Sequence, residues 1–216
     1  MKKNLIMDII KALEWRYATK KFDSEAIISE ETIALLKQAF NLTASSYGLQ
    51  PVKLLIVSNK STLNALVPLS MNQKQVGQAS HLCVFCVETK IDEAYIRAFF
   101  DRIISINNTP DEALNPFRTS VINSFKEKSD DDVFKWGAKQ AYLAMGNMLT
   151  VCATQGVDAC PMEGFDPVEY DRFFKLNEQG LRSVLVMPIG YRAKDDMFGA
   201  MKKVRKPLNE SIIEFK

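Results

Sequence analysis

The stretch Leu82-Cys83-Val84-Phe85-Cys86-Val87 is apolar at every position. A short run of this kind is typical of a strand that is covered on both faces of its sheet. Two further runs, Leu54-Leu55-Ile56-Val57 and Ser183-Val184-Leu185-Val186-Met187, have the same character. The three runs predict a central sheet that lies between other layers of structure.

Helical patterns precede and separate these strands. Apolar residues recur at helical spacing over 4–18, 92–106, 115–128 and 131–155. Ser29 can cap a further helix, and Gly156 is placed to end the last one. The chain of 216 residues therefore fits one α/β or α+β domain over 1–216, because a chain of that length can bury roughly 70% of its unfolded surface.

The composition excludes several classes of protein. Hydrophobic residues make up 47% and charged residues 25% of the chain, which is ordinary globular usage and argues against disorder or a fibrous architecture. The formal net charge is +2, and there is no long basic block, so we expect no nucleic-acid partner. No apolar run reaches the roughly 18 residues of a membrane span, so we expect no membrane partner either.

Cysteine usage and the first residues bear on location. The N-terminal segment reaches Asp8 and Lys11 before a signal-peptide core could form. The four cysteines, at positions 83, 86, 152 and 160, are too few for a disulfide scaffold without a secretory cue. We therefore expect a cytoplasmic protein with reduced thiols.

Two segments raise the question of a second subunit. The helix predicted over 131–155 has a wider apolar surface than one core contact needs. It is either covered by a homodimer partner or buried as the central helix of a monomer. The apolar Ile212-Ile213-Glu214-Phe215 follows a basic loop, so we expect it to dock on a surface, which could be the partner's.

Several familiar site types find no support. Cys83 and Cys86 have metal-like spacing, but residues three apart in a strand point to opposite faces and cannot converge on one ion. His81 is the single histidine, and no ligands group around it for zinc. There is also no glycine-rich phosphate loop, so any nucleotide must be held in another way.

Side-chain cations offer that other way. Arg presents a planar fork to phosphate oxygens, and Lys presents a mobile point charge. Two basic segments supply such residues, Arg16-Tyr17-Ala18-Thr19-Lys20-Lys21 and Lys202-Lys203-Val204-Arg205-Lys206. The alternative for each segment is a solvated basic surface.

Two loops could present polar groups to a ligand. Ser45-Ser46-Tyr47-Gly48-Leu49-Gln50-Pro51 precedes a predicted buried strand, and hydroxyl and amide groups are frequent in it. The alternative is an ordinary loop. Pro161-Met162-Glu163-Gly164-Phe165 follows the long helix, and its glycine permits backbone geometry that could aim an amide at a ligand.

Taken together and in this order, the segments closely resemble the oxygen-insensitive nitroreductase family, in its branch of bacterial NAD(P)H nitroreductases and dihydropteridine reductases. The resemblance covers nearly the whole chain, and no single piece carries it alone. Its motifs are Met7-Asp8-Ile9-Ile10, Arg16 to Asp23, Ser45-Ser46, Gln50-Pro51, Asn72, Ala79-Ser80-His81, Trp136 with Ala138-Lys139-Gln140, Gly146-Asn147, Glu163-Gly164-Phe165-Asp166, and Lys203 with Arg205.

The resemblance implies an α+β, nitroreductase-like fold in which helices flank a mixed central sheet. It also implies an intertwined homodimer with FMN at the subunit interface and NADH or NADPH as the hydride donor. No catalytic acid or base is expected, because hydride transfer to the flavin N5 needs stacking and orientation more than proton transfer.

The resemblance also assigns the cofactor-binding residues. Arg16, Lys203 and Arg205 would hold the phosphate and ribityl chain, and Lys20 would lie near the N1 and O2 edge of the ring. Ser45 and Ser46, from the partner subunit, would line the ring and ribityl chain. The remaining expected contacts are Tyr17 and Ala18 in the first motif, Asn72 near the N3 and O4 edge, Gln75, and the backbone of Pro161, Met162, Glu163 and Gly164 over one ring face.

The chain departs from the family pattern in places that affect the site. Ala18 stands where relatives commonly have Ser, and Gln75 stands where many have Lys. We therefore expect a less positive ring pocket and a lower flavin potential. The region 105–130 aligns poorly, and Phe125 is the residue in it that we assign to the substrate.

The resemblance favours one function over two alternatives. The favoured function is an FMN-dependent oxidoreductase that takes hydride from NAD(P)H and reduces small acceptors such as nitroaromatics, quinones or pteridines. One alternative is a flavin enzyme dedicated to one unidentified metabolite. The other is a dimeric flavin-binding protein without turnover.

Overall fold

A four-stranded sheet forms the centre of the computed structural model, which describes residues 8–216. The strands are β1 (Val52–Val57), β2 (His81–Glu88), β3 (Asp158–Ala159) and β4 (Leu181–Gly190), in the order β1-β2-β4-β3. The three predicted strands are confirmed, and each pair of named strands is antiparallel. Among the described residues, parallel pairing is limited to the isolated bridge between Ala18 and Ala159. Apolar runs locate strands but carry no information on their direction, so the structure refines the predicted mixed sheet at this point.

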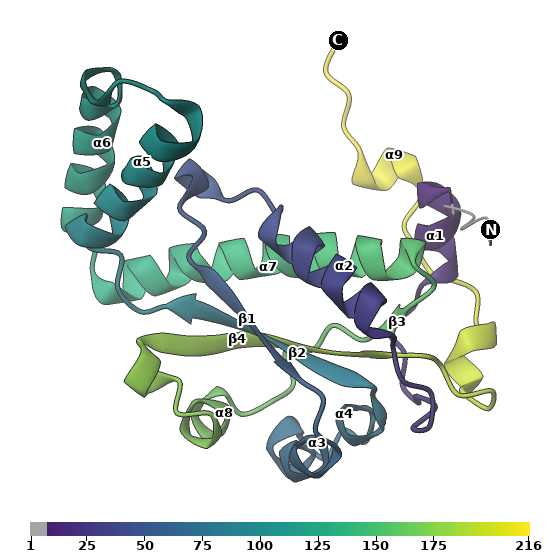
Figure 1. Ribbon diagram of the computed structural model, residues 1–216. Helices are drawn as coiled ribbons and strands as arrows, with labels where there is room; N and C mark the ends of the chain where they lie inside the picture. Colours follow the sequence, from purple (N-terminus) through teal and green to yellow (C-terminus); the bar gives the residue numbers. More distant parts are fainter. Residues whose placement is uncertain (1–7) are drawn as a thin grey trace.

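Helices cover both faces of the sheet, which explains the apolar runs in β1, β2 and β4 (Figure 1). On one face lie α2 (Glu30–Asn41) and α7 (Asp130–Thr154), and on the other lie α3 (Lys60–Leu66), α4 (Gln75–Gln78) and α8 (Pro167–Phe173). Cys83 packs in the first of these layers, and Cys86 packs in the second. The prediction that the two thiols point to opposite faces is confirmed.

A helical hairpin extends from one end of the sheet (Figure 1). It consists of α5 (Glu93–Asn107) and α6 (Asp111–Lys126). The second helix begins earlier than the predicted residue 115, because Asp111 and Glu112 in its first turn suit the positive end of the helix dipole. Pro116 is tolerated inside the helix. The hairpin packs against the start of α7 through an apolar cluster of its own that includes Phe125 and Val133.

The capping residues set the limits of several helices. Ser29 begins α2, where its hydroxyl accepts the backbone N–H of Thr32 at 3.2 Å. Gly156 follows α7 with φ +67°, as a residue in the left-handed region after a helix should. The first helix, α1, spans Ile9–Trp15 rather than 4–18. Residues 4–7 of that prediction lie outside the described part of the chain, and Arg16 leaves the helix with ψ 144°.

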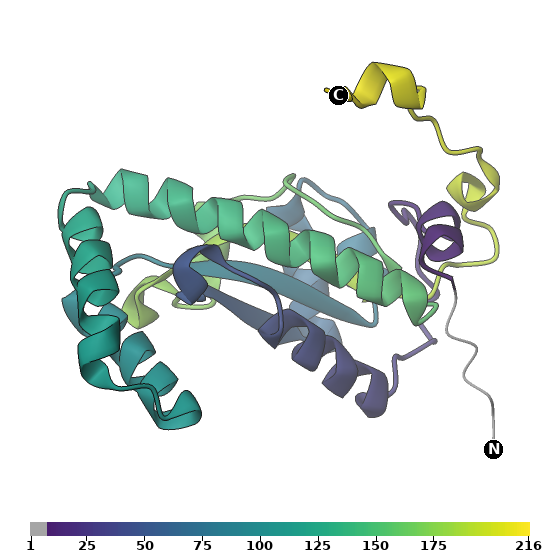
Figure 2. The same cartoon turned by 90° about the horizontal axis from the view of Figure 1, so that it is seen from above.

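The C-terminal segment leaves the body of the protein. After β4 the chain passes η4 (Met197–Ala200) and ends in α9 (Leu208–Ser211), and Figure 2 shows this last helix standing clear of the other elements. Ile213 and Phe215 are 96% and 102% exposed. No helix within residues 8–216 is long and apolar enough to cross a membrane. The remaining short helices are η1 (Ser46–Gly48), η2 (Pro68–Ser70) and η3 (Asn177–Gln179).

Candidate functional site

The two predicted cationic segments meet at one end of the sheet, where the purple and yellow parts of Figure 1 lie side by side. They line a shared cavity of about 390 Å³. The N-terminal segment contributes Arg16, Tyr17, Ala18 and Lys20, and the C-terminal segment contributes Lys203 and Arg205. The structure therefore brings together side chains that are nearly 190 positions apart in the sequence.

The cations of this cavity form no ion pair within residues 8–216, although Glu14 also lines the cavity. None of Arg16, Lys203 and Arg205 forms an ion pair there, and the Lys203 ammonium donates instead to the backbone carbonyl of Arg16. Burial, and then the charge of Arg205, lowers the pKa of the Arg16 guanidinium. Burial and the nearby Arg16 and Arg205 lower the pKa of Lys203 in the same way. These groups repel one another, so an anion bound among them is favoured.

An ion pair with a buried carboxylate supports the wall of this cavity. The Arg192 guanidinium contacts the Asp158 carboxylate with Nη2–Oδ1 2.6 Å and Nε–Oδ2 3.1 Å. The Asp158 side chain is 3% exposed. The same guanidinium lies 4.1 Å from the ring centre of Trp15 and 4.6 Å from that of Tyr17. The two residues that flank Arg16 in the sequence, Trp15 and Tyr17, therefore both pack against the Arg192 guanidinium.

Lys20 lies next to a second group of predicted residues. Its Nζ is 3.7 Å from the Cys160 sulfur, and Cys160 directly precedes Pro161. Burial raises the pKa of the Cys160 thiol, while the Lys20 ammonium opposes that shift. The Gln75 amide lies 3.8 Å from the Met162 sulfur. The structure therefore places Lys20, Gln75 and the 161–164 loop around one location.

Gln75, which stands where many relatives have Lys, is buried in this structure. Gln75 is 6% exposed and donates to the Gln73 side chain at 2.9 Å, whereas the neighbouring Lys74 is exposed. An uncharged amide therefore occupies the inward position. Asn72 is exposed and adopts φ +57° in the turn before α4.

The backbone of the 161–164 loop is fixed on one side and free on the other. Met162 exchanges backbone hydrogen bonds with Val186 of β4 at 2.9 and 3.1 Å. The Gly164 carbonyl accepts from Gln73 Nε2 at 2.8 Å, and a Cβ on Gly164 would lie 2.7 Å from that nitrogen, so a larger residue there would displace the Gln73 side chain. The backbone N–H groups of Glu163 and Gly164 donate to no other group of residues 8–216. They are available to an acceptor atom of a ligand.

An apolar cavity of about 500 Å³ adjoins the same loop. Pro161, Met162 and Glu163 form one wall, and Tyr142 and Gly146 of α7 contribute to another. The Tyr142 hydroxyl donates to Glu163 Oε1 at 2.7 Å, so the glutamate side chain is engaged in the fold. This contact agrees with the expectation that the backbone of Glu163, rather than its carboxylate, faces a ligand.

Three predicted site residues lie apart from the cations in this chain. Ser45 and Ser46 precede β1, and the Ser46 backbone N–H donates to Gln140 Oε1 at 2.9 Å. Phe125 is 5% exposed and packs edge to face on Trp136, with ring centres 5.0 Å apart. Within residues 8–216 its ring belongs to the α5–α6–α7 cluster rather than to the cation cavity.

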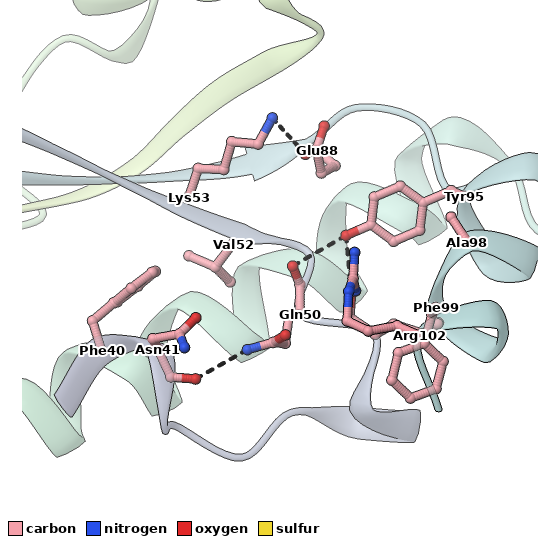
Figure 3. Close-up of a pocket in the computed structure, with 11 residues that line it drawn as sticks. Phe40, Asn41, Gln50, Val52, Lys53, Glu88, Tyr95, Ala98, Phe99 and Arg102 are labelled. Carbon is pink, nitrogen blue, oxygen red and sulfur yellow. Dashed lines mark hydrogen bonds and ion pairs between the residues drawn. The ribbon is translucent and has the colours of Figure 1, made fainter. Parts of the chain in front are cut away.

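A cavity of about 590 Å³ lies where β1 meets α5, away from the predicted site (Figure 3). Its walls include Lys53, which pairs with Glu88 at 3.0 Å, and Tyr95, whose hydroxyl donates to the carbonyl oxygens of Leu49 and Gln50. None of the predicted cofactor residues lines it. Its size alone therefore does not make it the centre of the chemistry.

Sequence reasoning missed several residues that shape the site. Asp158 and Arg192 form the part-buried pair, Asp196 joins the N-terminal cationic segment to η4, and Cys160 contacts Lys20. Only Asp158 and Cys160 carried a usable signal, because both lie within three residues of the start of the 161–164 motif. Asp196 lies in a polar turn next to Asp195, and nothing in the local sequence distinguishes the two acids.

Comparisons with known proteins give a consistent result. The chain is 31% identical to an oxygen-insensitive NAD(P)H nitroreductase from Salmonella typhimurium and 32% identical to one from Enterobacter cloacae, covering 96% of this chain and 100% of each relative. An Exiguobacterium sibiricum protein solved in complex with FMN matches 97% of this chain and 98% of its own, with a TM-score of 0.83 at 19% identity. The model of the nitroreductase family matches residues 13–191. The chain therefore belongs to the nitroreductase family, and its fold is nitroreductase-like, as predicted.

Proposed function

We propose that this protein is an FMN-dependent oxidoreductase that uses NADH or NADPH to reduce small acceptors such as nitroaromatics, quinones or pteridines. The observation that carries the proposal is the cavity in which Arg16, Lys203 and Arg205 converge without forming an ion pair among residues 8–216. A flavin monophosphate supplies the missing charge. The names of the Salmonella and Enterobacter relatives and the FMN complex of the Exiguobacterium protein support the same assignment.

The residues of the site divide into those for the phosphate and those for the ring. Arg16, Lys203 and Arg205 would hold the phosphate and the ribityl chain, where charge-assisted hydrogen bonds are strongest. Lys20 would place its ammonium at the N1 and O2 edge. The cofactor, when bound, supplies the two-electron carrier that accepts hydride from the nicotinamide and passes it to the acceptor.

The 161–164 loop would form the floor on which the flavin ring lies. The free N–H groups of Glu163 and Gly164 can hydrogen-bond an acceptor atom of the ring, and the pairing of Met162 with β4 keeps those groups in place. Gln75 contributes no charge at the ring, so a lower flavin potential is expected than with lysine there. No side chain of this group has to move a proton during hydride transfer.

We also propose that the chain forms an intertwined homodimer. In the C-terminal segment, Leu208, Ile213 and Phe215 are 75%, 96% and 102% exposed, and α1 exposes Ile9 and Ile10 at 55% and 60%. Apolar surface of this extent on one chain is typical of an interface. Ser45 and Ser46 of the partner subunit would then complete the cofactor site.

We place the activity in the cytoplasm, as one FMN-binding domain over residues 1–216. The four cysteines are buried and unpaired, in keeping with a reducing compartment. Reduced nicotinamide nucleotides, the hydride donors of the proposal, are abundant there.

Steady-state oxidation of NADH and NADPH tests the enzymatic function. Protein loaded with FMN should oxidise either donor faster when menadione or nitrofurazone is added, and the rate pattern should be ping-pong because donor and acceptor use the same space. Protein freed of FMN is the control and should be inactive. If the loaded protein showed no acceptor-dependent rate, it would be a flavin-binding protein and not a reductase.

Light scattering tests the homodimer. The full chain should have twice the mass of one subunit, and a variant that ends after residue 207 should lose both the dimer and FMN retention, because α9 and the apolar tail would be gone. A monomeric full-length protein that still binds FMN would contradict the shared site.

A further inference from the structure

Asp196 joins the N-terminal cationic segment to η4, which precedes the C-terminal cationic segment. It lies in the turn after β4 and is 9% exposed. Its Oδ2 accepts the Tyr17 hydroxyl at 2.9 Å and the backbone N–H groups of Lys20 and Lys21 at 3.0 and 3.1 Å. Its Oδ1 accepts the backbone N–H of Phe198 at 3.2 Å and so begins η4, from which the chain runs into the cationic C-terminal segment. One carboxylate therefore holds both walls of the cavity.

Tyr17 is held from its other side as well. Its ring lies 4.6 Å from the Arg192 guanidinium, which is in turn fixed by the buried Asp158. Its hydroxyl group is fixed by Asp196. The residue that follows Arg16 is therefore fixed at both ends, and this limits the positions that the Arg16 guanidinium can reach.

The charge of Asp196 works against anion binding. Burial raises the pKa of its carboxyl, but the hydrogen bonds from Tyr17, Lys20, Phe198 and Lys21 outweigh burial and hold that pKa below its usual value. The group is thus an anion at neutral pH, close to a cavity that is lined by cations. If charge alone mattered, its removal would strengthen the binding of a phosphate.

We propose that Asp196 is a positioning residue that orders the two cationic segments around the phosphate of the cofactor. The proposal rests on the proposed function, because it assumes that the cavity receives the phosphate of FMN. Riboflavin lacks the phosphate of FMN. The preference for FMN over riboflavin should therefore depend on Asp196, although Asp196 touches neither ligand. Loss of the negative charge of Asp196 should strengthen FMN binding, whereas loss of its ordering hydrogen bonds should weaken it. The sign of the change in affinity therefore separates the two effects.

The test compares Asp196→Asn with Asp195→Asn in the full-length protein freed of flavin. Both substitutions remove one negative charge, but Asp195 is 70% exposed and contacts only Lys21 among side chains of the described residues. Quenching of flavin fluorescence gives the dissociation constants for FMN and for riboflavin. We expect Asp196→Asn to weaken FMN binding about tenfold and riboflavin binding less than about threefold, whereas Asp195→Asn leaves FMN binding unchanged or tighter.

Other outcomes overturn the proposal. Unchanged or tighter FMN binding by Asp196→Asn would show that only charge matters, and equal weakening for FMN and riboflavin would show a general structural role. If Asp196→Asn does not fold, as judged by circular dichroism, Tyr17→Phe decides, because it removes one hydrogen bond and keeps the ring on Arg192. It should weaken FMN binding about threefold, without effect on riboflavin; no change would refute the proposal. Failure of the parent protein to bind FMN would instead refute the proposed function.

Discussion

Replacing Arg16 by Gln should weaken FMN binding and, at the same time, stabilise the protein without flavin. Glutamine keeps much of the length and a hydrogen-bond donor but removes the charge. A hydrogen bond between charged partners contributes about 1.5–3 kcal/mol, so the dissociation constant for FMN should rise about 10- to 150-fold. The effect should shrink as salt is added, because ions screen partly exposed charges.

The stabilising effect is expected in protein freed of flavin. Burial and the charge of Arg205 lower the pKa of Arg16, so the folded protein bears a cost for keeping Arg16 protonated there. After discounting for solvent screening, its removal should raise the free energy of unfolding by about 0.5–1 kcal/mol. Both effects arise because the Arg16 cation forms no ion pair among the described residues when FMN is absent.

Two titrations measure these effects, quenching of flavin fluorescence for affinity and urea unfolding followed by circular dichroism for stability. Arg172→Gln is the matched control, because Arg172 on α8 is 69% exposed and pairs with Glu169 far from the cavity. The control should leave FMN affinity unchanged. If Arg16→Gln bound FMN within twofold of the parent, or if it lowered the stability of the flavin-free protein, Arg16 would be part of the scaffold and the reasoning would fail.

Three further predictions concern other parts of the chain. Gln75→Lys places a cation at the buried inward position and should raise the flavin midpoint potential in a potentiometric titration; an unchanged midpoint would remove Gln75 from the ring environment. Burial and the hydrogen bond to Asp196 raise the pKa of Tyr17 to about 12. Protonated Tyr17 should contribute fully to stability below about pH 10, and this contribution should be lost towards pH 12. The difference in alkaline absorbance between the parent and Tyr17→Phe should show the ionisation of this tyrosine. An ionisation midpoint near the ordinary tyrosine value would contradict the buried contact. Burial raises the pKa of Cys83 and Cys86 to about 12. Ellman's reagent should therefore react slowly with the native protein, whereas all four thiols should react in denaturant. Rapid labelling of the native protein would show that the sheet core is open.

The parts of the fold that follow from local pattern were predictable from the sequence. The apolar runs located β1, β2 and β4, and Ser29 and Gly156 marked helix limits because capping depends on single residues. Strand direction was not predictable, since a run covered on both faces reads the same in either direction. The path of Arg16 was also missed, because a periodicity argument extends a helix until a breaker appears and none occurs there.

The candidate site divides in the same way. The cations could be named from the sequence because phosphate binding restricts residue type, and their convergence in one cavity is what the structure adds. Asp196 could not be found, because its role depends on contacts with residues about 175 positions away. Phe125 lies in an apolar cluster in this chain, and its assignment to the substrate stays a prediction that depends on where the partner subunit lies.

Retention of flavin shows whether the converging cations form a cofactor site. Protein freed of flavin should be incubated with excess FMN and passed through a desalting column, and the visible spectrum of the eluted protein should then be recorded. We predict stoichiometric FMN, with absorption bands that bleach when NADH or NADPH is added without air. Folded, dimeric protein that elutes without any flavin would contradict it.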